Sequence, residues 1–178
     1  MKKTIAAVVC AAAAALSVQA HAEDAKVLRM ACESTYAPFV FFDSETGKLK
    51  GFEIDLLEYV AKEMGRKLEV TNMGFDAIIP SMLTGITDVG ASAFTITPER
   101  AKRVLFSKPY YISGLSILVR AEDKDKIKSV KDIENCTICA QIGTSGSMRA
   151  AKVPGAKVRN FNTINDAYLE LGNKGCKA

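Results

Sequence analysis

The sequence lacks tryptophan and has one histidine, His21, among its 178 residues. His21 lies in an N-terminal stretch with the features of a secretory signal peptide: a basic start at Met1–Lys3, an apolar run at Thr4–Val18, and the small-residue cleavage pattern Ala20-His21-Ala22. A membrane anchor is the alternative, but the apolar run is shorter than the roughly 18 residues that a spanning helix needs. We therefore expect residues 1–22 to be cleaved, which leaves the exported chain without histidine.

Loss of the only histidine excludes several kinds of site. Serine or cysteine nucleophiles activated by histidine cannot form, and neither can zinc sites with histidine ligands. Strong charge is missing as well. The 24 Lys and Arg residues face 20 Asp and Glu, and the net charge of +4 is too small and too evenly spread to indicate nucleic-acid binding. With 48% apolar and 25% charged residues, the composition is otherwise typical of a globular protein.

Four cysteines follow the leader: Cys32, Cys136, Cys139 and Cys176. An exported protein meets an oxidising compartment, so disulfides are expected, and four thiols allow three complete pairings. The Cys-x-x-Cys at 136–139 lies in an apolar run typical of a buried strand, where residues three apart face opposite sides of the sheet. Structural cysteines are therefore favoured over a redox centre. Our hypothesis is a Cys136–Cys176 bridge between the starts of two neighbouring strands.

Hydrophobic periodicity predicts alternating strands and helices, which is typical of an α/β fold with parallel sheet covered on both faces. A charged loop at 121–128 suggests two lobes, joined near residues 112–120. Residues 172–178 resemble the beginning of a further strand, so we expect the chain to be a fragment of a longer protein. Strands are expected at 27–32, 67–71, 88–94, 115–120, 137–142 and 157–161, a hairpin at 39–51, and helices at 53–64, 76–83, from about 147, and at 165–171.

Two segments that follow predicted strands are suited to binding a carboxylate. Thr97-Pro98-Glu99-Arg100 has a helix cap, a proline at the first helical position and an arginine in the first turn. Arginine binds carboxylates with two parallel hydrogen bonds, and ligands of open α/β sheets lie at this edge. Gly143-Thr144-Ser145-Gly146-Ser147 opens a second helix with exposed N–H groups. Each segment alone is equally consistent with an ordinary capped helix.

A third segment, Glu33 to Phe39, supplies an acid and the aromatic Tyr36 after the first strand, and Phe75 begins a predicted helix. Taken singly, such aromatics more often pack in the core. Together with Arg100 they describe a pocket with an anionic end, a cationic end and flat apolar walls. Such a pocket suits a zwitterionic small molecule.

Five motifs in order carry a resemblance to a known family: YAPF at 36–39, GFEIDL at 51–56, FDAIIPSM at 75–82, TITPERAKRVLFSKPYY at 95–111 and IGTSGS at 142–147. From about Val27 to Ala178 the chain resembles the periplasmic amino-acid-binding proteins of ABC importers, family 3 of the bacterial extracellular solute-binding proteins. The resemblance implies a two-lobe, type II periplasmic-binding-protein-like α/β fold that is incomplete at the C-terminus. The first lobe would run from 23 to 114 and the second from 115 to 178.

The resemblance also implies roles for particular residues. Arg100 would bind the ligand α-carboxylate, helped by N–H groups of the Thr144–Ser145 turn, and Ser92 and Thr95 would share in bonding the carboxylate and the α-ammonium group. The family often has serine where this sequence has Ala93, and the family's ammonium-binding aspartate falls beyond Ala178.

The resemblance implies that the ligand side chain lies between the rings of Tyr36 and Phe75, and that Glu33 contacts the cationic tip of that side chain. The expected ligand is arginine, lysine, ornithine or histidine, with glutamine or another polar amino acid as the second choice. The expected partner is a membrane permease, the expected location the periplasm and the expected state a monomer, without cofactor, metal or nucleic acid. A cyclohexadienyl-dehydratase-like enzyme and the ligand-sensing domain of a receptor are the alternatives on this scaffold, and we expect a binding protein and no enzyme.

Overall fold

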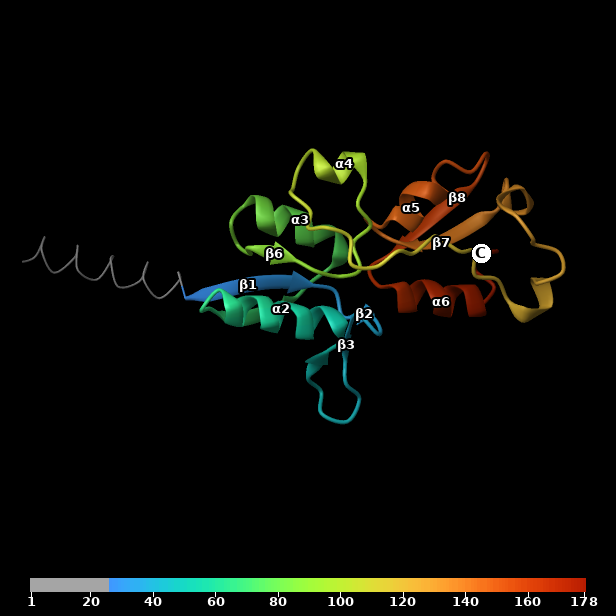
Figure 1. The fold of residues 1–178 in the computed structure, drawn as a ribbon. Helices are drawn as coiled ribbons and strands as arrows, with labels where there is room; N and C mark the ends of the chain where they lie inside the picture. The colour runs from blue at the N-terminus through green and yellow to red at the C-terminus, as the bar shows by residue number, and fades with distance from the viewer. Residues whose placement is uncertain (1–25) are drawn as a thin grey trace, which may run out of the picture.

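The computed structural model describes residues 26–178, and the expected signal peptide lies outside them. The first lobe is built on a parallel sheet of three strands in the order β5 (Lys67–Asn72), β1 (Val27–Cys32) and β6 (Val89–Gly90). The strand–helix alternation predicted from the sequence is therefore present, with the helices lying on either side of this sheet (Figure 1).

The central strand β1 places successive side chains on opposite faces of the sheet. Met30 and Cys32 pack with Ile54 of helix α2 (Phe52–Glu63) on one face. Ala31 packs with Ile78 of α3 (Phe75–Leu83) on the other. Because strand side chains alternate with a period of two, a continuous apolar run such as this one serves two layers of helix.

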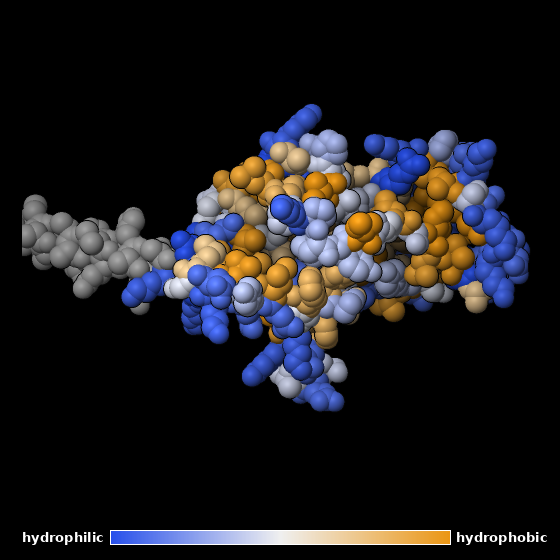
Figure 2. All heavy atoms as spheres, viewed as in Figure 1, coloured by the Kyte–Doolittle hydropathy of each residue, from blue (hydrophilic) through white to orange (hydrophobic). Residues whose placement is uncertain are grey.

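A small antiparallel sheet of β2 (Thr35–Tyr36), β3 (Val40–Phe42) and β4 (Leu49–Lys50) follows β1 and confirms the predicted hairpin. The turn is held by Asp43, whose carboxylate accepts from the N–H of Thr46 and from the Lys50 ammonium group. These bonds lower the pKa of Asp43 well below its usual range. The hairpin projects from the lobe and is mostly hydrophilic, as the blue side chains at the bottom of Figure 2 show.

The second lobe is built on the parallel pair β7 (Thr137–Gln141) and β8 (Lys157–Phe161). Ile138 of β7 packs in one cluster with Ala150 of α5 (Ser145–Ala150) and Ile133 of the 3-10 helix η2 (Val130–Ile133). Another 3-10 helix, η1 (Ala121–Asp123), precedes η2 in the chain. Helix α6 (Ile164–Gly172) also packs against β7. Helix α5 begins two residues before the predicted position, because Thr144 is its N-cap and accepts from the Ser147 N–H.

The disulfide joins Cys139 to Cys176, and the predicted Cys136–Cys176 bridge is wrong. The last residues lie alongside β7: the Lys177 N–H donates to the Thr137 carbonyl, and the Cys139 N–H donates to the Ala178 carbonyl. This register brings the Cα atoms of Cys139 and Cys176 to 5.8 Å, whereas Cys136 lies before the strand.

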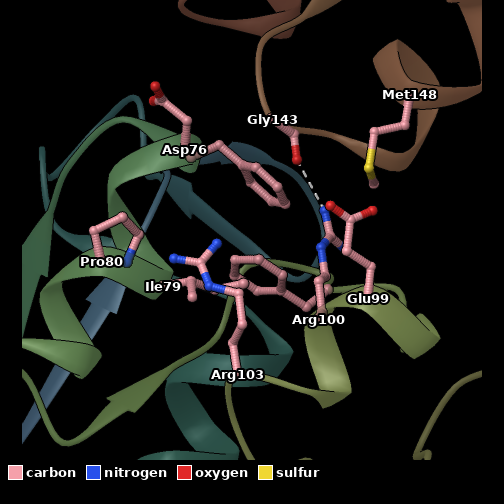
Figure 3. A pocket seen from close by; sticks show the side chains of 10 residues that line it. Asp76, Ile79, Pro80, Glu99, Arg100, Arg103, Gly143 and Met148 are labelled. Atoms are coloured by element: carbon pink, nitrogen blue, oxygen red, sulfur yellow. Dashed lines mark hydrogen bonds between the residues drawn. The ribbon is translucent and has the colours of Figure 1, made fainter.

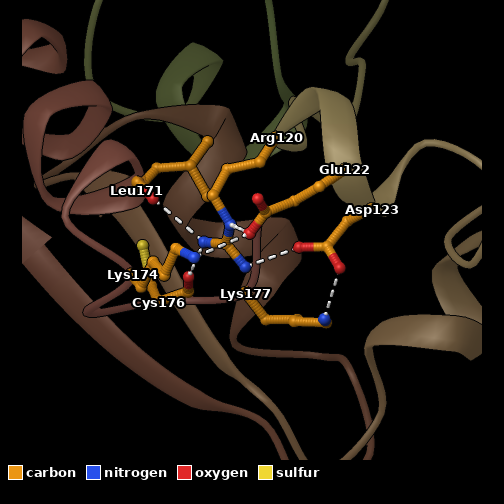
Figure 4. Close-up of polar contacts among 7 residues, drawn as sticks. All are labelled: Arg120, Glu122, Asp123, Leu171, Lys174, Cys176 and Lys177. Carbon is orange, nitrogen blue, oxygen red and sulfur yellow. Dashed lines mark hydrogen bonds and ion pairs between the residues drawn. The ribbon is translucent and has the colours of Figure 1, made fainter.

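Arg120 reinforces this arrangement by donating to the Leu171 and Cys176 carbonyls at 2.9 and 2.7 Å (Figure 4). Asp123 pairs with Arg120 and with Lys177, and these contacts lower its pKa.

The strand predicted at 115–120 is wrong. Between α4 (Pro98–Ala101) and η1, the described chain forms no helix or strand. Ile112 is 93% exposed and Leu115 59% exposed, although both belong to a sequence of high β-propensity. A strand requires a neighbour to pair with, and no described strand pairs with this segment.

The strand predicted at 88–94 is shorter than expected: β6 ends at Gly90, and further along Ala93 adopts a φ of 50°, in the left-handed region. No helix within residues 26–178 is long and apolar enough to cross a membrane.

Candidate ligand-binding site

Arg100 lies in the first turn of α4, where the sequence predicted it. Thr97 is the N-cap and accepts from the Arg100 N–H, and Pro98 occupies the first helical position. The guanidinium is buried, with a residue exposure of 6%. It donates to the Thr95 carbonyl at 2.8 Å and, across the lobes, to the Gly143 carbonyl at 3.0 Å. Two of its five N–H donors are thus occupied by neutral acceptors.

Aromatic rings form the wall beside this guanidinium. The ring of Phe75 stacks on Phe94 with centroids 4.4 Å apart, and Tyr36 tilts against Phe75 at 5.7 Å. The guanidinium carbon of Arg100 lies 5.4 Å from the Phe75 centroid and 5.0 Å from that of Phe94. Burial among these rings lowers the pKa of Arg100. Tyr36 and Phe75 are therefore in direct contact with each other, and Phe94 is an aromatic that the sequence analysis did not single out.

Glu33 is also buried, at 5% exposure, and its carboxylate has only neutral partners. Its Oε2 accepts from the Thr35 hydroxyl at 2.6 Å and from the side-chain amide of Gln141 at 3.2 Å. The Tyr36 hydroxyl donates to Oε1 of the same Gln141 at 2.5 Å. Burial and the nearby Glu33 charge raise the pKa of Tyr36. Glu33 and Tyr36 from the first lobe therefore meet Gln141 of the second.

Ser92 is fully buried, and its hydroxyl is used within the first lobe. It accepts from the Glu33 N–H at 3.1 Å and donates to the Glu33 carbonyl at 3.0 Å. These two hydrogen bonds replace the backbone bonds that a paired strand would form at this position, so Ser92 fixes the backbone of Glu33. The next residue, Ala93, donates its N–H to both carboxylate oxygens of Glu53, and burial raises the pKa of that acid.

The predicted hydroxyl residues of the two lobes meet across the cleft. The Thr95 and Ser145 hydroxyls are 3.2 Å apart. Thr144 is occupied within its own turn, because its hydroxyl caps α5 and donates to the Gln141 carbonyl at 2.8 Å. The same turn approaches the first lobe so closely that a Cβ on Gly143 would lie 2.8 Å from Cβ of Asp76. The two lobes are thus closed on each other.

A cavity of about 200 Å³ remains at the Arg100 end of the cleft (Figure 3). Phe75 and Phe94 line it with Arg100 from the first lobe, and Gly143 and Met148 line it from the second. At the Glu33 end, the Gln141 amide lies between the carboxylate and the Tyr36 hydroxyl. The structure therefore brings seven of the eight predicted residues to one inter-lobe cleft, with Ser92 behind Glu33.

Sequence reasoning missed Gln141 and Glu53. Gln141 is the last residue of a strand whose following turn was already selected, and its position at the strand end was a usable signal. Glu53 entered the sequence analysis only as the first residue of the helix predicted at 53–64 and as part of the motif at 51–56.

The family model described as "Bacterial extracellular solute-binding proteins, family 3" matches residues 28–178. The chain belongs to this family. One curated relative is a probable histidine-binding protein of Campylobacter jejuni, 34% identical over 146 residues, which are 82% of this chain and 56% of the relative. The chain spans little more than half the length of the curated relatives it matches first.

Two solved structures show the same architecture. An ancestral arginine-binding protein bound to arginine has a TM-score of 0.80 and 39% identity, covering 85% of this chain and 68% of that one. An ancestral amino-acid-binding protein described as a precursor of cyclohexadienyl dehydratase has a TM-score of 0.78 and 41% identity over the same shares. The type II periplasmic-binding-protein fold implied by the sequence is therefore confirmed, and the relatives named so far are amino-acid-binding proteins.

Proposed function

We propose that this protein binds a free L-amino acid with a cationic side chain and presents it to the membrane permease of an ABC importer. The observation that carries the proposal is a pair of buried charged groups in one cleft, neither of which has an ion-pair partner. Within residues 26–178, neither Arg100 nor Glu33 forms an ion pair, although both side chains are buried. Buried charges are normally paired, so a ligand with a carboxylate at one end and a cation at the other complements both.

The roles of the residues follow from their places in the cleft. The α-carboxylate lies at Arg100, whose guanidinium lines the cavity with two of its five donors in use, and Thr95 and the Thr144–Ser145 turn provide neighbouring polar groups. The ligand side chain lies against Tyr36 and Phe75. Its cationic end meets Glu33.

The setting of the protein is part of the same proposal. A cleaved leader directs it to the periplasm, where it acts as a monomer with the permease as its partner and without metal, cofactor or nucleic acid. The named binding proteins among its relatives support transport over catalysis.

Titration calorimetry of the full chain with arginine, lysine, glutamine and glutamate tests this function. We expect arginine and lysine to bind more tightly than glutamine, and glutamate to bind least. In Glu33→Gln the loss for arginine should be about 10- to 100-fold, because a charge-assisted contact contributes about 1.5–3 kcal/mol. Glu58→Gln removes the same charge from the exposed face of α2 and should change nothing. Equal affinity of the wild type for arginine and glutamine would contradict the role of Glu33.

The enzyme alternative is favoured by one observation, the likeness to the precursor of cyclohexadienyl dehydratase. Its chemistry needs an acid–base group in the cleft; residues 26–178 contain no histidine, so a glutamate such as Glu33 or a lysine would have to serve. Incubation with cyclohexadienyl acids, followed by ultraviolet detection of an aromatic product, separates the two functions. We expect no product.

A further inference from the structure

Gln141 connects the two lobes at the end of the cleft where the ligand side chain is recognised. It is the last residue of β7 and is 1% exposed. Its Oε1 accepts from the Tyr36 hydroxyl, and its Nε2 donates both to Glu33 Oε2 and to the Asn162 carbonyl, the latter at 3.0 Å. Reversing the amide would place its oxygen against two acceptors. The orientation of Gln141 is therefore fixed by its surroundings.

This fixed amide acts on one oxygen of the Glu33 carboxylate. Oε2 receives the hydroxyl of Thr35 and the amide of Gln141, whereas Oε1 receives no hydrogen bond from the described residues. Within residues 26–178, the one side-chain polar atom that is sealed from solvent and lacks a hydrogen bond is Arg120 Nε, which still forms an ion pair with Glu122; Glu33 Oε1 is therefore not sealed from solvent. One carboxylate oxygen is held, and the other is available.

Both partners of Oε2 are neutral donors, and this matters for selectivity. A lysine or arginine at position 141 would neutralise Glu33 and remove its preference for a cation. An amide orients the carboxylate and leaves its negative charge for the ligand. Because Gln141 belongs to the second lobe, it reaches Glu33 only when the lobes are closed.

We propose that Gln141 is a specificity-determining positioning residue, which holds Glu33 from across the cleft so that Oε1 meets the cationic end of the ligand in the closed state. This inference rests on the proposed function. A cationic ligand gains from the oriented carboxylate, whereas a neutral one of similar size does not. Loss of the Gln141 amide therefore weakens the two classes of ligand unequally.

The test compares L-arginine with L-glutamine by titration calorimetry on the full chain. We expect Gln141→Leu to weaken arginine binding about tenfold, the effect of one hydrogen bond to a charged group, and to change glutamine binding less than about twofold. Thr35→Val removes the other donor from within the first lobe and should shift the same ratio. Asn165→Leu makes a matched amide-to-leucine change at an exposed position of α6 and should leave both affinities unchanged.

The outcomes separate this inference from the function on which it rests. A wild type that binds neither amino acid overturns both. If the wild type prefers arginine and Gln141→Leu keeps the same preference, only the role of Gln141 is overturned. An equal loss of affinity for arginine and glutamine in Gln141→Leu overturns it as well, because a residue that only aids closure has that effect. Gln141→Asn repeats the test with a buried amide one methylene shorter. Failure of both position-141 variants to fold assigns Gln141 to the core and overturns the inference.

Discussion

Replacing Gly143 with alanine should prevent full closure of the two lobes. Gly143 has a φ of 74° and lies in the turn between β7 and α5. A Cβ at this position would lie 2.8 Å from Cβ and 3.0 Å from Cα of Asp76. Non-bonded carbon atoms prefer separations of about 3.5–4.0 Å. Asp76 belongs to the first turn of α3, so its Cα and Cβ move only with the helix, and the lobes must separate.

The substitution has two effects of different origin. The left-handed backbone costs an L-residue roughly 1–2 kcal/mol, and this cost falls on the second lobe alone. The overlap with Asp76 acts on closure. A site that forms only in the closed state has an apparent affinity proportional to the fraction of molecules that can close. We therefore expect the affinity for arginine to fall by more than about tenfold. Gly85 is a matched control: its φ is 73°, and no atom lies within 4 Å of a Cβ placed there.

Three measurements on the full chain separate these effects. Chemical denaturation should show a similar loss of stability in Gly143→Ala and Gly85→Ala. Small-angle X-ray scattering should show a larger radius of gyration only in Gly143→Ala, and titration calorimetry should show weaker arginine binding only in that variant. Two variants with equal radii and equal arginine affinity would refute the closed arrangement of the lobes.

Two further predictions concern groups outside the ligand contacts. Burial raises the pKa of Glu53, so its contribution to stability is greatest below the ordinary glutamate pKa of about 4.3 and declines as pH rises toward the raised value. Denaturation at several pH values should show this decline in the free energy of unfolding for wild type but not for Glu53→Gln, whose side-chain oxygen can still accept from the Ala93 N–H. The same pH dependence in both proteins would contradict the raised pKa of Glu53. In a urea titration, Cys139→Ser should lower the free energy of unfolding by about 3–4 kcal/mol, as expected for opening a disulfide loop with a sequence separation of 37. Cys136→Ser, which removes a free thiol, should unfold like the wild type.

Features that depend on neighbouring residues were predictable from the sequence. The cap and proline at Thr97 and Pro98 gave the correct start of α4, because both act within one turn of helix. The apolar run of β1 indicated burial on both faces, which the packing of α2 and α3 confirms. The ordered motifs contain most of the residues that meet in the cleft, because most of these motifs follow the end of a strand.

Features that depend on distant partners were not predictable. The choice of Cys139 over Cys136 depends on how residues 176–178 lie beside β7, a register set by backbone hydrogen bonds that no local pattern reveals. The expected strand at 115–120 has the right composition, but no described strand pairs with it. Gln141 matters only because a residue 108 positions away, Glu33, lies opposite it across the cleft.

The two buried charges, Arg100 and Glu33, also link ligand binding to closure. Burying Arg100 and Glu33 opposes the closed state, since desolvation disfavours both charged groups. Here the closed cleft offsets part of that cost with neutral partners: the Gly143 carbonyl for Arg100 and the Gln141 amide for Glu33. Both of these partners come from the second lobe. A ligand charged at both ends would add an ionic contact at each, and only the closed state holds both side chains in place. The free energy of closure would therefore depend on the two ends of the ligand together, so a neutral side chain would lose both an ionic contact and part of the stabilisation of the closed form.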